Sequence, residues 1–305
     1  MKRWFVLAVW VAGLAGAAGA KVEARHFPAD ASVVVHLDLK ALNESPMGQY
    51  ILRSLDSDAQ RGLMWLQSAS GVNLTNDVDS LVIYGKGNLQ TGAVFVAYGR
   101  FDVARLTSLA AGAKAYQNKA VGARSLMSWE DKGKRVSLCF ADPTVAILSQ
   151  DEQEVLKALA RFDGLPQGTD GDGRFSRVLS HADGRFLALQ ADNLKDLPAR
   201  NPQFQMVKQA DALLLEVSQL AVANGLDGTL SVKAASKEQA QQLQQAALGI
   251  QALLTLQADQ NPDAAALAQQ ARVVVQEDVV SLNLRITEEQ LSKMVKVRVE
   301  QQRQA

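Results

Sequence analysis

Three histidines, His26, His36 and His181, are the first residues to test for chemistry. Their spacing forms neither a His-Glu-x-x-His nor a His-x-His pair of metal ligands, so we expect each on the surface. Ser180 and His181 stand close to Asp183, and these are the residue types of a hydrolase triad, but neighbours on an extended chain point apart. The chain also lacks the Gly-x-Ser-x-Gly turn that presents a nucleophilic serine. The sequence therefore does not favour a serine hydrolase.

Aspartates gather in a glycine-rich stretch, residues 163–173. Asp163, Asp170 and Asp172 offer the hard oxygen ligands that calcium prefers, but the spacing lacks the downstream bidentate glutamate of an EF-hand loop. We interpret the stretch as solvated chain. Calcium binding by these three aspartates is left open by the sequence.

Cys139 is the only cysteine, so no internal disulfide forms. It lies in the apolar segment 135–140, which predicts a strand, and a buried thiol is favoured over a nucleophile there. Gly85-Lys86-Gly87 precedes a strand and lacks the Gly-Lys-Ser/Thr sequence of a phosphate loop, so these are interpreted as turn glycines. We assign no catalytic, cofactor-binding or metal-binding residue from the sequence.

The first twenty residues have the three parts of an export signal. Lys2 and Arg3 come first, an apolar run covers residues 4–14, and the small residues Ala18-Gly19-Ala20 end it. We predict a signal peptide over residues 1–20, cleaved after Ala20, and a periplasmic or extracellular location. Left uncleaved, this run is the only membrane attachment that we expect, and it is shorter than the roughly 20 residues that span a bilayer.

Composition argues against nucleic acid as a partner. The chain has 32 Lys plus Arg and 32 Asp plus Glu, so loss of Lys2 and Arg3 leaves a slight acidic excess. The basic residues are spread among acidic ones, whereas a phosphate-binding surface clusters them. Apolar residues make up 48% of the chain, and its length exceeds what one core comfortably holds. Two domains are therefore expected.

Hydrophobic spacing predicts the elements of the first half. Residues 33–39 alternate as a strand whose apolar side faces the core, with His36 and Asp38 on its wetter side. A capping box from Ser149 to Glu152 begins a helix. The other predicted elements are helices at 46–55, at 57–71 and after Asp102, and strands at 79–84, 92–98, 123–130, 135–140 and 145–149.

The order of elements then repeats. Residues 164–180, rich in glycine and aspartate, predict a linker between a first domain, residues 21–163, and a second, residues 181–305. The offset between matching strands falls from 153 to 132, and the 21 missing residues correspond to the helix at 57–71. The matching segments are strands at 186–190, 211–215, 228–232 and 279–282, a helix from Ser236-x-x-Gln239 to about residue 258, and a cap at Thr287. We therefore predict a tandem duplication of a βαββαββα unit.

The helix that begins after Ser236 is the longest predicted element. Its apolar stripe could support a coiled coil, but Leu248, Leu253 and Leu256 broaden the stripe beyond such a seam. We therefore expect these leucines in the core of their own domain.

Two segments carry a resemblance to other proteins. Pro28-Ala29-Asp30 with the strand that follows it, and the hairpin segment from Val82 to Gly87, resemble exported bacterial proteins of unknown function. The resemblance covers most of the chain beyond the signal. It implies an exported compartment and a duplicated α/β unit, and it carries over no functional residue.

We predict an α+β protein of two similar tandem domains, each a mainly antiparallel sheet with helices packed on one face. The expected function is non-catalytic binding or scaffolding of another envelope component, an unidentified protein or ligand, without a cofactor. One alternative is a hydrolase whose site is assembled only in the fold, for example from Asp38 with Glu130 or Glu216. The other is a carrier of an apolar ligand, which requires a large dry pocket between helices and sheet.

Overall fold

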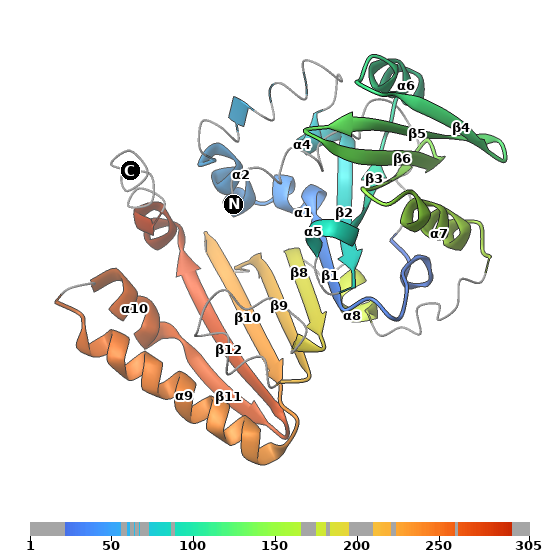
Figure 1. Cartoon of the computed structure of the whole chain (residues 1–305). Helices are drawn as coiled ribbons and strands as arrows, with labels where there is room; N and C mark the ends of the chain where they lie inside the picture. The colour runs from blue at the N-terminus through green and yellow to red at the C-terminus, as the bar shows by residue number, and fades with distance from the viewer. Residues whose placement is uncertain are drawn as a thin grey trace. The chain divides into compact units, whose positions relative to one another are not determined.

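The computed structural model of the chain contains two compact units (Figure 1). Unit 1 comprises Met1–Asn43 and Leu55–His181, and unit 2 comprises Glu44–Ser54 and Ala182–Ala305. The structure describes residues 22–55, 60–61, 64, 67, 73–86, 89–165, 175–180, 184–194, 210–220, 224–259 and 262–294. The predicted signal peptide, most of the predicted helix at 57–71, and Asp170, Asp172, His181 and Asp183 lie outside these residues.

Unit 1 is built on an antiparallel sheet. Its described strands are β1 (Val33–Asp38), β2 (Val78–Gly85), β3 (Val94–Gly99), β4 (Gln117–Val121), β5 (Arg124–Asp131), β6 (Lys134–Asp142) and β7 (Val145–Ser149). They lie in the order β1-β2-β3-β7-β6-β5-β4, and each neighbouring pair is antiparallel. The hairpin and the meander that the spacing predicted are thus joined through β3 and β7.

Helices cover both faces of this sheet. Leu106 and Ala110 of α6 (Val103–Ala111) pack with Trp129 and Leu138 on one face. The register places Tyr98 on the opposite face, where α7 (Glu152–Phe162) packs and brings Phe162 to 6.3 Å from the Tyr98 ring. The other described helices that belong wholly or mostly to unit 1 are η2 (Ala24–His26), α1 (Leu39–Glu44), α4 (Leu74–Asp77), α5 (Leu89–Gly92) and α8 (Ser176–Leu179). The prediction of helices on one face therefore differs from the structure in this unit, because two amphipathic helices flank one apolar sheet.

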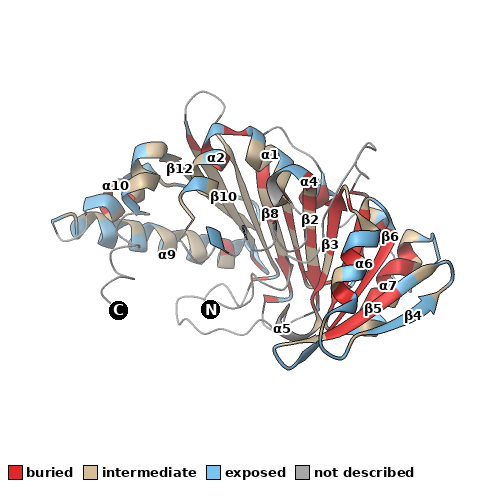
Figure 2. Cartoon of the chain, turned by 90° about the horizontal axis from the view of Figure 1, so that it is seen from above, coloured by how far each residue is buried: buried red, intermediate tan, exposed pale blue. Residues whose placement is uncertain are grey.

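The strands of unit 2 are antiparallel as well. Its strands are β8 (Arg185–Asp192), β9 (Ala212–Gln219), β10 (Gly225–Lys233), β11 (Arg272–Gln276) and β12 (Val279–Thr287), in the order β11-β12-β10-β9-β8. The helices are α2 (Pro46–Arg53), α9 (Lys237–Leu256), α10 (Pro262–Gln270) and a last one over residues 288–294. The described sheet residues of unit 2 are less buried than those of unit 1, as Figure 2 shows for β10 and β12.

The predicted α+β class with antiparallel sheets is confirmed. Both units begin with a three-stranded meander and a helical connection, and the last strand of each unit pairs with the third. After the connection unit 1 has four strands, β4, β5, β6 and β7, whereas unit 2 has only β11 and β12. The topology matches β12 with β7, whereas the residue pattern had matched it with β6. The shared order agrees with a duplication, which itself stays a prediction.

The compact units depart from the predicted domain boundaries at two places. Residues Glu44–Ser54, which include α2, belong to unit 2, where the Met47 amide donates to Gln219 Oε1 over 3.1 Å. The segment predicted as linker contains the described residues Phe175, Val178 and Leu179, and these are buried in unit 1. Glycine and aspartate dominate this segment, and its short apolar stretch lacks a spacing pattern that would predict burial.

Most helix caps follow the predicted chemistry. Ser45, Asp102, Ser236 and Thr287 each accept a hydrogen bond from the amide three residues on. The prediction of a capping box from Ser149 to Glu152 is wrong. Helix α7 begins at Glu152, and its cap is Asp151, whose carboxylate accepts a hydrogen bond from the Gln153 amide over 2.8 Å. Ser149 Oγ donates instead to the Ala93 carbonyl over 2.9 Å.

Candidate functional site

A serine and a histidine meet inside unit 1. Ser80 Oγ of β2 lies 2.7 Å from His36 Nε2 of β1, and His36 Nδ1 lies 3.0 Å from the Val178 carbonyl of α8. A carbonyl only accepts, so Nδ1 carries the proton, and Nε2 of the neutral ring accepts from the serine hydroxyl. A serine bonded to a histidine whose other nitrogen is oriented by a third group is the arrangement of an activated nucleophile. Sequence spacing does not reveal this pair, since 44 residues separate its members.

The burial of this pair favours a structural role. His36 and Ser80 are each 3% exposed, so a substrate has no approach to the hydroxyl. Asp38, the nearest acid on the same strand face, accepts from the Ala41 amide over 2.8 Å and is itself buried. The expectation of a surface His36 beside a wet Asp38 is therefore wrong, because α8 lies against β1 on this side. The hydrogen bonds of His36 with Ser80 and with the Val178 carbonyl link β1, β2 and α8.

His26 is also buried, against the surface expectation. Its ring stacks on Phe162 with centroids 4.1 Å apart. Burial lowers the pKa of His26 below its ordinary value, nearby Glu23 opposes this shift, and Arg25 adds to it. The neutral ring is thus part of the packing between η2 and α7.

The Cys139 thiol is buried, and the Asp163 carboxylate is held in an ion pair. Cys139 is completely buried in β6, which confirms the prediction of a buried thiol, and burial raises the pKa of this thiol to about 11. Both carboxylate oxygens of Asp163 accept from the Arg124 guanidinium over 2.8 Å. The Asp163 carboxylate is thus engaged by a bidentate ion pair rather than offered to calcium.

The carboxylates proposed for a hydrolase do not meet. Asp38 lies in β1 and Glu130 in β5, five strands apart in the order of the sheet, which corresponds to about 24 Å. Glu130 pairs with Lys114 over 2.6 Å. Glu216 belongs to unit 2, where it binds Arg185 over 2.6 Å. These three acids therefore serve ion pairs and a backbone cap.

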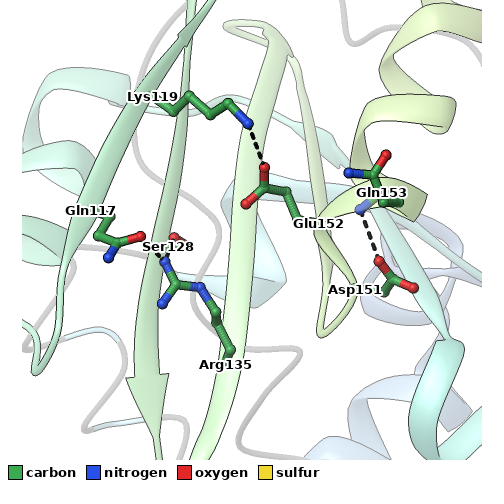
Figure 3. A network of polar contacts seen from close by, with 7 residues as sticks. All are labelled: Gln117, Lys119, Ser128, Arg135, Asp151, Glu152 and Gln153. Atoms are coloured by element: carbon green, nitrogen blue, oxygen red, sulfur yellow. Dashed lines mark hydrogen bonds and ion pairs between the residues drawn. The ribbon is translucent and has the colours of Figure 1, made fainter.

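A polar network ties the edge strand β4 to its neighbours (Figure 3). Lys119 donates to Glu152 at the start of α7 over 2.9 Å. Arg135 of β6 donates to Ser128 Oγ over 2.6 Å and also bonds the Gln117 side chain. These charges are exposed, so each pair contributes little to stability. They cover the edge of unit 1 with polar groups.

Helix α9 of unit 2 exposes apolar side chains instead of polar ones. Helix α9 has no charged residue between Glu238 and Asp259. Five of its large aliphatic side chains are exposed: Leu248 39%, Ile250 54%, Leu253 61%, Leu254 36% and Leu256 81%. We call these five residues the α9 surface. The expectation that Leu248, Leu253 and Leu256 lie in the core is wrong, because only the side of α9 near Ala240 and Leu243 packs on the sheet.

The arrangement of residues on α9 explains this exposure. Successive helical residues turn by about 100°, so Leu256 lies about 160° from the buried Ala240. Gln251 donates to the carbonyls of Ala268 and Ala271, which fixes one flank of α9 beside the end of α10. Ile250 and Leu253 lie about 100° and 160° from Gln251 and face away from that contact. The apolar stripe is thus both wider and longer than the part of α9 that packs on the sheet, since Ile250 and Leu254, within about 20° of Leu243 around the helix, are also exposed.

A pocket of 280 Å³ lies between α10 and the last helix of unit 2. Its lining includes Leu267 and Met294, but also Asp263, Glu289 and Lys293. It is smaller than typical ligand pockets of about 300–1,000 Å³, and the charged side chains keep it from being the large dry pocket of a lipid carrier.

The described part of the chain holds no group of three metal-ligating side chains. None of its described helices is long and apolar enough to cross a membrane.

The chain has a structural neighbour among solved proteins. No protein-family model and no curated protein matches the chain. The chain is similar to a structure described as crystal form I of TP0453, with 14% sequence identity and a TM-score of 0.49. The alignment covers 90% of this chain and 97% of that one.

Proposed function

We propose that this chain is an exported, non-catalytic binding protein and that the α9 surface contacts another component of the envelope. The observation that carries the proposal is the exposure of the five aliphatic side chains on one helix, which has no charged residue after Glu238. Isolated exposed leucines are ordinary, but a contiguous apolar patch on a folded protein marks an interaction site. Export rests on the signal-like residues 1–20.

The chemistry of α9 favours a protein partner over a lipid surface. Helices that lie in a membrane interface carry Lys and Arg on their polar face. The polar positions of α9 are glutamines, and its single lysine, Lys237, pairs with Glu277 at the first turn. Leucine and isoleucine beside uncharged amides suit the apolar groove or helix of another protein.

The side chains that point away from the sheet have the most to gain from a partner. Burying one leucine is worth about 1.5–3 kcal/mol before the costs of association. Leu256 is 81% exposed and Leu248 39% exposed, so a contact that covers both removes considerable apolar surface from water. Neither side chain is needed for the core of unit 2, so both are open to substitution.

Co-purification from the native envelope tests this function. The double variant Leu248→Gln, Leu256→Gln keeps helix propensity and removes the apolar contact. We expect the wild-type chain to retain a defined component and the double variant to lose at least nine-tenths of it. The matched control is Lys157→Gln on α7, an exposed helical position of unit 1 that should retain the component. Equal retention by the double variant contradicts the proposal.

A further inference from the structure

The edge strand next to α9 has a charge only at its first residue, Arg272, and an apolar middle. Within the described residues β11 pairs only with β12, so its other edge faces outward. Its sequence is Arg272-Val273-Val274-Val275-Gln276, and Val274 is 43% exposed. Natural edge strands carry Lys, Pro or bulges that prevent association, as the Lys119 position does in β4. Three consecutive valines instead favour a partner strand.

The flank of α9 beside this edge is apolar too. Leu243, Ala246, Ile250 and Leu253 follow the three-four spacing of a helix-pairing seam. Leu243 packs on the sheet, whereas Ile250 and Leu253 are exposed on the side away from α10. Figure 1 shows α9 running alongside β11 at the border of unit 2. The open edge and the exposed flank are therefore neighbours.

We propose that a second copy of this chain covers both features, with the two β11 strands pairing antiparallel about a two-fold axis. A register centred on Val274 places Val274 opposite the same residue, Val273 opposite Val275, and Arg272 opposite Gln276. No like charges face each other in this register, so the strand is complementary to itself. The two unit 2 sheets become one continuous antiparallel sheet.

The position of α9 fits this symmetry. A two-fold axis that relates antiparallel neighbours stands perpendicular to the sheet, so both α9 helices lie on the same face. Helix α9 packs against both β11 and β12 and thus lies above the gap between them. With strands about 4.8 Å apart, that gap is about 5 Å from the axis, and the two helices are about 10 Å apart. This is the upper end of the usual distance between packed helices, about 8–10 Å.

Self-association shares the exposure of Ile250 and Leu253 with the proposed function, but it adds the edge strand β11 and is tested at other residues. The second copy takes the flank with Ile250 and Leu253. Leu248 lies about 160° and 140° from these two residues around the helix, whereas Leu256 lies about 60° from Leu253, at the border of the flank. A dimer then offers two such contacts side by side, which raises avidity for a repeated partner. Failure of one proposal leaves the other in place, since the Leu248→Gln, Leu256→Gln variant is expected to remain a dimer.

Sedimentation velocity of the purified mature chain tests the dimer. We expect a wild-type dimer whose dissociation constant rises at least about tenfold in Val274→Lys and in Val274→Glu, because each variant places like charges opposite one another. Mixing the two variants should restore the dimer, since the lysine of one faces the glutamate of the other. The matched control is Asn118→Lys on the exposed edge strand β4, which should leave the dimer unchanged. A wild-type chain that stays monomeric at concentrations up to about 100 µM would have a dissociation constant above that value, and this result overturns the proposal.

A disulfide test does not depend on weakening the dimer. Val274→Cys should form a covalent dimer under mild oxidation, because the two-fold axis brings both thiols together. The native Cys139 is buried and does not interfere. Lys134→Cys, exposed in unit 1, serves as the control and should stay monomeric. Equal cross-linking at both positions contradicts the assigned register.

Discussion

Replacement of Ser80 by alanine separates the two roles that its geometry allows. The variant removes a 2.7 Å hydrogen bond between groups that are each 3% exposed. The lost bond costs about 1 kcal/mol, and depriving His36 Nε2 of that donor inside the protein adds about 1–2 kcal/mol. The expected loss in the free energy of unfolding is therefore about 2–3 kcal/mol. The melting temperature should fall by about 4–12 °C for a chain of this size.

Urea unfolding followed by tryptophan fluorescence measures this loss, since Trp129 is buried in unit 1. Ser108→Ala is the control, because the exposed Ser108 hydroxyl bonds the carbonyl of Ala104 within its own helix and should matter by less than about 0.5 kcal/mol. A fluorophosphonate probe, which labels activated serines, should leave Ser80 unmodified in the folded protein. A loss under about 0.5 kcal/mol, or covalent labelling of Ser80, would refute the structural role.

Three further predictions follow from buried groups. The pKa of His26 is lower in the folded than in the unfolded chain, so the unfolded chain binds more protons. The free energy of unfolding should therefore fall as the pH drops below about 6.5. The His26→Phe variant should show a smaller fall when unfolding is measured across this pH range. In the folded protein Cys139 should resist a thiol reagent at pH 8, because with a pKa of about 11 only about one thiol in a thousand is ionised. In urea the exposed thiol should react at once. Glu216→Gln weakens the ion pair of the 8% exposed Arg185 and should cost about 2 kcal/mol in thermal unfolding, whereas Lys293→Gln in an exposed pair should cost almost nothing.

Much of the fold was predictable because local rules and burial agreed. The alternation in β1, the caps at Ser45 and Asp102, and the hairpin of β2 and β3 each follow from a few neighbouring residues. The cap at Ser149 failed because Asp151 competes for the same helix start, and two residue types with similar capping ability cannot be ranked by spacing alone.

The candidate sites were less predictable, since they depend on distant segments. His36 and Asp38 alternate away from the apolar side of β1, and nothing local shows that α8 covers them. The exposed leucines of α9 have the opposite cause: the helix is apolar around most of its circumference, but only the narrow strip near Ala240 and Leu243 meets the sheet. Sequence spacing reports which residues are apolar, whereas the number of covering elements decides which are buried.

Site-specific cross-linking in the native envelope tests the role of the α9 surface most directly. A photoreactive amino acid at position 256 should yield one adduct with a defined envelope protein, and the Leu248→Gln change should weaken it. The same amino acid at position 157 on α7 should yield none. The mass of the adduct distinguishes a different protein from a second copy of this chain. Absence of an adduct at position 256, or the same adducts at both positions, would contradict a binding function for this helix.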